Sequence, residues 1–297
     1  MLASLEATRS TPTDYEVILV DDGSTDGTRA WLETLPTSRF RVLLNERNVG
    51  YAISNNRAAA AARGQQLLLL NNDVVLLPGW LEPLRAAHRR LGIRAGVIGN
   101  VQRNARTGAI DHAGMTITLK GKPEHDHEWP NRWARLTRSV KIVPAVTAAC
   151  ALVDAALWRQ LGGFDEGFVN GGEDVDLCFR ARAAGRVNAV AVRSVVLHHV
   201  SSSAGRKRRD EENSCRLAQR WRREFIAEGV RAWSRRQAEA ILAEPRNFEP
   251  KFAWRVWCHA RGLSRTPPAE GVTALQRAMD VEFARWGDIT GTALPAP

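Results

Sequence analysis

The chain has 297 residues, 44% of them hydrophobic, and a formal net charge of +10. This length suffices for one large domain, or for one domain with an appendage. No apolar run approaches the roughly 20 residues that span a bilayer, and the first residues lack the charged-then-apolar order of a signal peptide. Four widely spaced cysteines without a Cys-x-x-Cys pair favour reduced thiols in the cytoplasm and argue against a disulfide scaffold or a zinc ribbon.

The positive charge has two interpretations. It can attract an anionic partner such as a nucleotide diphosphate, a membrane surface or nucleic acid. It can equally reflect arginines spread over solvated faces of an Ala- and Arg-rich chain, and we favour this interpretation for most of the charge. No zinc-finger spacing or RNA-binding aromatic signature is present, so we expect no nucleic-acid partner.

Strand and helix patterns alternate from residue 15 to about residue 100. Apolar runs predict strands at 15–22, 40–46, 66–73 and 95–100, and the stretches between them predict helices at 26–35, 50–64 and 77–92. Continuous apolar strands separated by helices indicate a parallel sheet that is covered on both faces.

The pattern loosens after residue 100. We predict hairpin strands at 109–121, a polar loop at 121–139, a strand at 140–153, a helix at 154–163 and one or two strands at 187–199. From residue 206 the chain is rich in Arg and Trp with helical spacing. We therefore expect a sheet domain at 1–205 and a helical extension at 206–297.

Two polar clusters directly follow predicted strands, where open α/β sheets bind ligands. In "VDDGSTDGT" (20–28), Asp21 and Asp22 can hydrogen-bond a base or ribose, although an ordinary capped turn explains them as well. In "NND" (71–73), Asp73 is well placed for a hard divalent cation, which takes one or two protein carboxylates. The alternative for this second cluster is a plain polar turn.

A third cluster, "NGGEDVDLCFRARAAG" (170–185), opens a predicted helix. Glu173 and Asp174 fall in its first turn, where carboxylates are favoured by the helix dipole. Asp176 and Arg180 are spaced for a surface ion pair.

Two histidines, His198 and His199, end the last predicted strand. Neutral imidazole is a common metal ligand, although a buried, hydrogen-bonded ring is the more frequent fate of a single histidine. Because the two are adjacent in a strand, we expect one to point inward and the other outward.

These motifs resemble family 2 glycosyltransferases of the GT-A fold. "VILVDDGSTDGT", "NVGYAISNNRAAAAARG", "LLLLNNDVVLLPGWLEPL", "LGGFDEGFVNGGEDVDLCFRARAAG" and "LHHVSSS" follow one another in the order found in the bacterial branch that includes rhamnosyltransferases. The resemblance covers residues ~3–225 and implies a Rossmann-like, mostly parallel sheet with helices on both faces.

The resemblance implies a role for individual positions of the donor site. Asp22 matches the residue that contacts the nucleobase, and Asp73 matches the last acidic residue of the metal-binding D-x-D motif. The other positions implied to bind the donor are Asp21, Asn48, Gly50 and Asn72.

The third motif supplies the implied catalytic residues. Asp174 matches the catalytic base, and Glu173 beside it shapes the acceptor site. His198 matches the metal-contacting histidine, with His199 as the alternative if the register slips by one.

The chain departs from the family at its start. The family begins with a strand of the type "SIVIPTYN", whereas Met1 here falls inside the helix that should follow that strand. We therefore expect the usual first strand to be missing, and favour a start codon set too far downstream over a trimmed chain or a decayed gene.

The sequence thus predicts an inverting, metal-dependent transferase of bacterial surface-polysaccharide synthesis. It would use Mg²⁺ or Mn²⁺, a nucleotide-diphosphate sugar as donor and a glycan or lipid-linked acceptor. We expect a cytoplasmic protein, and a peripheral membrane contact and a homodimer remain open. The alternative is a catalytically inactive binding or scaffolding relative.

Overall fold

The computed structural model describes residues 1–7, 15–128, 139–199 and 209–290. The chain forms two compact units, one of residues 1–115 and 125–209 and the other of residues 116–124 and 210–297. The predicted boundary between residues 205 and 206 lies outside the described residues. Residues 116–124 group with the C-terminal helices, not with the sheet domain to which the sequence assigned them.

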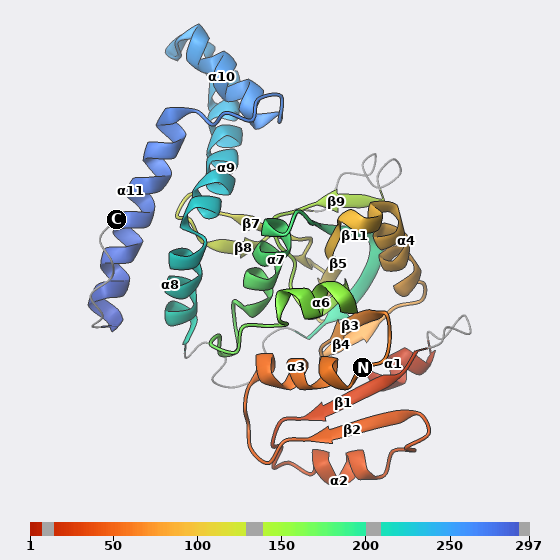
Figure 1. Ribbon diagram of the computed structural model, residues 1–297. Helices are drawn as coiled ribbons and strands as arrows, with labels where there is room; N and C mark the ends of the chain where they lie inside the picture. Colours follow the sequence, from red (N-terminus) through yellow and green to blue (C-terminus); the bar gives the residue numbers. More distant parts are fainter. Residues whose placement is uncertain (8–14, 129–138, 200–208, 291–297) are drawn as a thin grey trace. The chain divides into compact units, whose positions relative to one another are not determined.

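A small sheet opens the first unit (Figure 1). Strands β1 (Val17–Asp21) and β2 (Phe40–Leu44) pair in parallel, as alternating strands and helices predict. The helices of this region are α1 (Leu2–Ala7), α2 (Thr28–Glu33) and α3 (Tyr51–Ala61). Because β1 and β2 are parallel, the carboxyl end of β1 lies beside that of β2.

The larger sheet has seven strands in the order β3-β10-β5-β11-β4, with β6 beside β5 and β9 beside β11. Their bounds are β3 (Gln66–Leu70), β4 (Val74–Leu76), β5 (Ala95–Asn104), β6 (Ile110–His112), β9 (Val140–Ile142), β10 (Cys150–Asp154) and β11 (Val187–His198). Strands β3, β5 and β11 run in one direction, but β10 is antiparallel to both β3 and β5. The prediction of a mostly parallel sheet was therefore wrong for this sheet. A loop leads into β10, and no helical crossover forces a parallel direction on it.

Helices cover both faces of this sheet. They are α4 (Leu81–Leu91), followed by η1 (Gly92–Arg94), and α6 (Ala155–Leu161) and α7 (Glu173–Ala183). Ala189 and Ala191 of β11 belong to the core cluster that includes Leu84 of α4, and the alternate residues Val190 and Val192 are also buried. Burial of both sets matches the continuous apolar runs seen in the sequence.

One predicted strand differs from the observed structure, and another agrees with it. The run 140–153 is not one strand, because Pro144 and the following residues form a loop between β9 and β10. The run 187–199 is a single strand, β11, with a register shift between Ala191 and Val195. Among the described residues β1 pairs with β2 only, and the absence of a first family strand stays a prediction.

The second unit consists of a hairpin and helices. Its elements are β7 (Met115–Ile117), β8 (Pro123–His125), α8 (Asp210–Arg220), α9 (Arg222–Ala243), η3 (Pro245–Asn247), α10 (Pro250–Ala260) and α11 (Ala269–Thr290). Phe225, Leu275, Met279 and Trp286 are buried in its core. None of the helices that the structure describes combines the length and apolar character of a membrane-spanning segment.

Candidate active site

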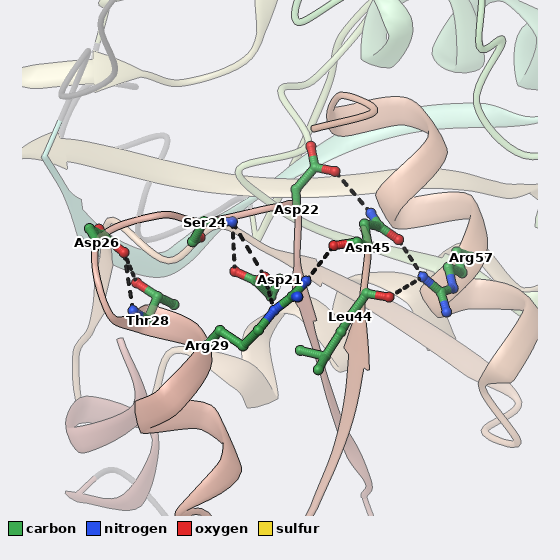
Figure 2. A network of polar contacts seen from close by, with 9 residues as sticks. All are labelled: Asp21, Asp22, Ser24, Asp26, Thr28, Arg29, Leu44, Asn45 and Arg57. Carbon is green, nitrogen blue, oxygen red and sulfur yellow. Dashed lines mark hydrogen bonds and ion pairs between the residues drawn. The ribbon is translucent and has the colours of Figure 1, made fainter. Parts of the chain in front are cut away.

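The end of β1 is held by a network of polar contacts (Figure 2). Both oxygens of Asp22 accept hydrogen bonds: Oδ1 from Asn45 Nδ2 and from the Val49 amide, and Oδ2 from the Gly50 amide, each at 2.9 Å. Asp22 therefore fixes the turn between β2 and α3. Its predicted role at a nucleobase stays a prediction, because its described contacts are to the protein itself.

Asp21 is buried and stabilises the turn that follows β1. Its carboxylate lies 3.4 Å from the Nε of Arg29 and accepts a hydrogen bond from the Ser24 amide at 3.3 Å. Arg29 also donates to the backbone carbonyl of Asn45 at 2.5 Å. The two aspartates thus tie β1, α2 and the end of β2 together.

Sequence reasoning missed Asn45 and Arg57, which complete this network. Asn45 is buried and donates to Ser54 at 3.0 Å, while Arg57 donates to the side-chain oxygen of Asn45 and to the Leu44 carbonyl. Both residues lie inside predicted elements as ordinary polar positions. No spacing in the sequence marks them.

Asn48 and Gly50 lie in the turn that Asp22 holds. A Cβ at Gly23 would lie 2.6 Å from the amide nitrogen of Asn48, so the two turns pack backbone to backbone. Gly23 has φ +74°, in the left-handed region that favours glycine. The side chain of Asn48 is exposed, as is that of Asn72 after β3, and both are accessible to a ligand.

The second cluster joins Asp73 to His198. Strand pairing places His198 opposite Val74, and the His199 amide donates to the Asp73 carbonyl at 2.9 Å. His198 Nε2 lies 3.3 Å from Asp73 Oδ1, whereas the His199 side chain is exposed. The structure therefore brings His198, rather than His199, to the predicted metal ligand.

The fit of this pair to a divalent cation can be tested by its geometry. Both ring nitrogens of His198 are buried, and among the described residues neither makes a hydrogen bond. Two ligand atoms each about 2.1 Å from an octahedral cation are about 3 Å apart, close to the observed 3.3 Å. Among the described residues no three ligating side chains converge, so this pair fits a cation whose remaining ligands are phosphate oxygens and water.

The third cluster begins α7 after Gly172, which has φ +93°. Asp174 is partly exposed and accepts hydrogen bonds from the Val175 amide at 2.8 Å and from the Ala148 amide at 3.2 Å. Glu173 is buried and accepts from the Gly171 amide at 2.7 Å. Of the two, Asp174 is therefore the carboxylate that an acceptor can reach.

The location of Asp176 differs from the predicted one. It does pair with Arg180, with 2.7 Å between Arg180 Nε and Asp176 Oδ2, but Asp176 is completely buried. The pair lies inside the protein because Arg180 also donates to the Leu161 carbonyl at the end of α6. It is an internal link between α6 and α7 and not a surface ion pair.

The segment 147–149 connects the second and third clusters. The Ala148 amide donates to Asp174, and the Ala149 carbonyl accepts from the Asn71 amide at 2.9 Å, two residues before Asp73. The Tyr51 hydroxyl, at the start of α3, donates to the Ala148 carbonyl at 3.2 Å. Sequence analysis did not single out Tyr51, although it directly follows the Gly50 that Asp22 holds.

Sequence comparison finds known proteins that resemble much of this chain. Residues 1–145 match the sequence profile of Glycosyl transferase family 2. The chain is 31% identical, over 69% of its length and 72% of the relative, to an N-acetylglucosaminyl-diphospho-decaprenol L-rhamnosyltransferase of Mycobacterium tuberculosis.

Two further relatives are much longer than this chain. It is 34% identical to the uncharacterized protein y4gI of Sinorhizobium fredii and 31% identical to the O-antigen biosynthesis protein RfbC of Myxococcus xanthus. The matches cover 71% and 64% of this chain but only 23% and 15% of those proteins.

The fold is similar to that of a solved transferase. A crystal structure of GalNAc-T7 with UDP, GalNAc and Mn²⁺ superposes with a TM-score of 0.55 at 16% sequence identity. The superposition covers 92% of this chain and 50% of that one. At this identity the likeness shows the fold alone.

Proposed function

Because the chain belongs to glycosyl transferase family 2, we propose that it transfers a sugar, with inversion at the anomeric carbon, from a nucleotide-diphosphate donor to a lipid-linked or glycan acceptor of a bacterial surface polysaccharide. Membership of the family makes it a glycosyltransferase. The inversion and the acceptor are the proposal. The names of the rhamnosyltransferase and of RfbC support the acceptor class.

One observation carries the mechanism: the Asp174 carboxylate and the Asp73–His198 pair are linked through the short segment 147–149. Asp174 lies in the first turn of a helix and accepts two backbone hydrogen bonds, which fix the position of its carboxylate. An ionised carboxylate there can take the proton from an acceptor hydroxyl as its oxygen attacks the sugar.

Asp73 and His198 would hold Mg²⁺ or Mn²⁺ on the donor side. A divalent cation at this place would neutralise the charge that develops on the leaving diphosphate. Asn48 and Gly50 lie in the turn after β2, Asn72 lies in the turn after β3, and all three are proposed to contact the donor. Asp21 and Asp22 would act there by fixing the turns that carry these contacts.

The test is Asp174→Asn with a matched control, Asp165→Asn. Asp165 lies in the loop before α7, is similarly half-buried and accepts a backbone hydrogen bond from Gly167 at 2.8 Å. Asp174→Asn should lower transfer by at least about 10²-fold, the scale of general-base catalysis, and leave the affinity for donor nucleotide within about threefold. Asp165→Asn should leave both unchanged.

Two results would contradict the proposal. Loss of nucleotide affinity in Asp174→Asn would assign that residue to donor binding. A wild-type chain that binds nucleotide and metal but transfers no sugar to any acceptor would favour the inactive, donor-binding alternative.

The second unit offers a surface suited to a lipid-linked acceptor. Trp254 on α10 is 64% exposed and stacks on Trp257 with 5.5 Å between ring centroids, and Arg261 lies over the Trp257 ring. Five Lys or Arg and one Glu occur between residues 245 and 265. Exposed tryptophans among cations are typical of helices that lie on anionic membrane surfaces.

This membrane contact can be measured with vesicles. Trp254→Ala should weaken co-sedimentation with vesicles of anionic phospholipid, while Trp31→Ala, at a side chain that is 50% exposed in the first unit, should not. Equal vesicle binding by the two variants would contradict the proposed membrane contact of the second unit. It would leave the proposed sugar transfer unaffected.

A further inference from the structure

The imidazole of His198 lies between two carboxylates. On one side Nε2 is 3.3 Å from Asp73 Oδ1, and on the other side Nδ1 is 3.6 Å from Asp111 Oδ2. The His198 side chain is 7% exposed, and those of Asp73 and Asp111 are 20% and 24% exposed. A neutral imidazole carries one proton, on either Nδ1 or Nε2. Each of these nitrogens of His198 faces one carboxylate, so the two carboxylates determine which tautomer forms.

The fold brings Asp111 to this place through strand pairing. Asp111 is the middle residue of β6, which pairs with β5, and β5 in turn pairs with β11 so that His198 lies opposite Asn104. The neighbour of Asp111, His112, is fully buried and accepts a hydrogen bond from the Thr147 amide at 3.4 Å. A register shift between Gln102 and Arg103 interrupts the regular alternation of side chains at β6, and the Asp111 carboxylate lies 3.6 Å from His198 Nδ1.

We propose that Asp111 is the positioning residue of the metal site: it accepts the Nδ1 proton of His198 and so leaves Nε2 unprotonated toward Asp73. This inference rests on the proposed function, which assigns the cation to Asp73 and His198. A metal-ligating histidine commonly donates its second nitrogen to a carboxylate, which fixes the tautomer and the ring orientation. At 3.6 Å the contact is longer than a hydrogen bond, so the proposal requires the two side chains to move closer together.

The geometry argues against Asp111 as a direct ligand. It faces Nδ1, the nitrogen on the far side of the ring from Asp73. A cation shared by Asp73 and Nε2 therefore has the imidazole ring between itself and Asp111. This agrees with the lack of three converging ligands among the described residues.

The experiment compares three variants of the full chain: Asp111→Asn, Asp111→Ala and the matched control Asp126→Asn. Asp126 lies in the same part of the first unit, is 23% exposed and pairs with Lys141 at 2.6 Å. The first readout is the 15N NMR signal of His198 in metal-free protein, which reports the tautomer without metal or turnover. The second is the affinity for Mn²⁺ alone, measured by electron paramagnetic resonance.

Asp126→Asn should show the same share of the Nδ1–H tautomer of His198 as the wild type. Asp111→Ala should shift the ring toward the Nε2–H tautomer and weaken Mn²⁺ binding by about 10–100-fold, the usual effect of losing such a partner. Asp111→Asn keeps an acceptor oxygen of the same size, so it should retain the tautomer and lose less affinity.

An unchanged tautomer in Asp111→Ala would overturn the inference, as would a Mn²⁺ affinity equal to that of Asp126→Asn. A loss in Asp111→Asn as large as that in Asp111→Ala would make Asp111 a direct ligand and would also overturn it. Failure of the proposed function looks different. Sugar transfer would then be absent while Asp111 still set the tautomer of His198.

Discussion

Asp22→Asn tests whether this carboxylate holds the turn between β2 and α3. In the wild type Oδ1 accepts from Asn45 and from Val49, and Oδ2 accepts from Gly50. Asparagine can keep the two bonds to Oδ1, but its amino group then faces the Gly50 amide, so that two donors meet. The variant therefore loses one hydrogen bond and the negative charge that strengthens the other two.

The loss can be estimated from these contacts. A hydrogen bond to a charged group contributes about 1.5–3 kcal/mol, and charge-assisted bonds are about twice as strong as neutral ones. Because Asp22 is partly exposed, we expect each hydrogen bond to contribute an energy near the low end of its range. The free energy of unfolding should therefore decrease by about 2–3 kcal/mol. If the turn contacts the donor, nucleotide affinity should fall by about tenfold or more, since each tenfold corresponds to about 1.4 kcal/mol.

Urea unfolding and calorimetric titration with UDP, GDP and dTDP measure the two effects. The control is Asp26→Asn in the same turn, because Asp26 is exposed and bonds to Thr28 two residues away. It should leave the unfolding free energy nearly unchanged. Equal unfolding free energies for the two variants would refute the anchoring role of Asp22.

Three further predictions concern stability. Gly23→Ala should destabilise the first unit by more than the roughly 1–2 kcal/mol of a left-handed residue, because its Cβ would meet backbone at 2.6 Å; urea unfolding should show this. Burial holds the pKa of His112 well below its usual 6.5, so the unfolded chain takes up a proton that the folded chain does not. The free energy of unfolding should therefore fall as the pH drops below about 6.5, by at most about 1.4 kcal/mol per pH unit, and urea titrations of His112→Gln should show a smaller fall. Trp286→Ala should cost about 3–5 kcal/mol, because this side chain is buried and donates to Glu211 at 2.6 Å; faster hydrogen exchange in α11 would report it.

Local sequence patterns predicted many of the strands and helices of the first unit correctly. The apolar runs before Asp22 and Asp73 are strands, and Glu173 and Asp174 begin a helix as predicted. These features depend on residues close together in the chain, where periodicity and glycine placement act directly. The direction of β10 and the burial of Asp176 depend on contacts between distant segments, which periodicity does not encode.

Asp111 shows the same limit within the site. In the sequence it is one polar residue of a hairpin, without a motif to mark it. Its position beside His198 arises only after β6 pairs with β5 and β5 with β11. His198 itself had two signals, its place at the end of an apolar strand and its match to the family motif, and the observed register against β4 separates it from His199.

The first turn of α3 joins the three clusters that the sequence placed at separate strand ends. The Gly50 amide donates to Asp22, the Tyr51 amide donates to Asn170 Oδ1 at 3.1 Å, and the Tyr51 hydroxyl donates to the Ala148 carbonyl. Asn170 adopts φ +54°, which is uncommon for a residue other than glycine. Such a conformation persists where surrounding contacts fix it. These contacts link the turn at Gly50, which we propose contacts the donor, to the loop before Asp174, the proposed base.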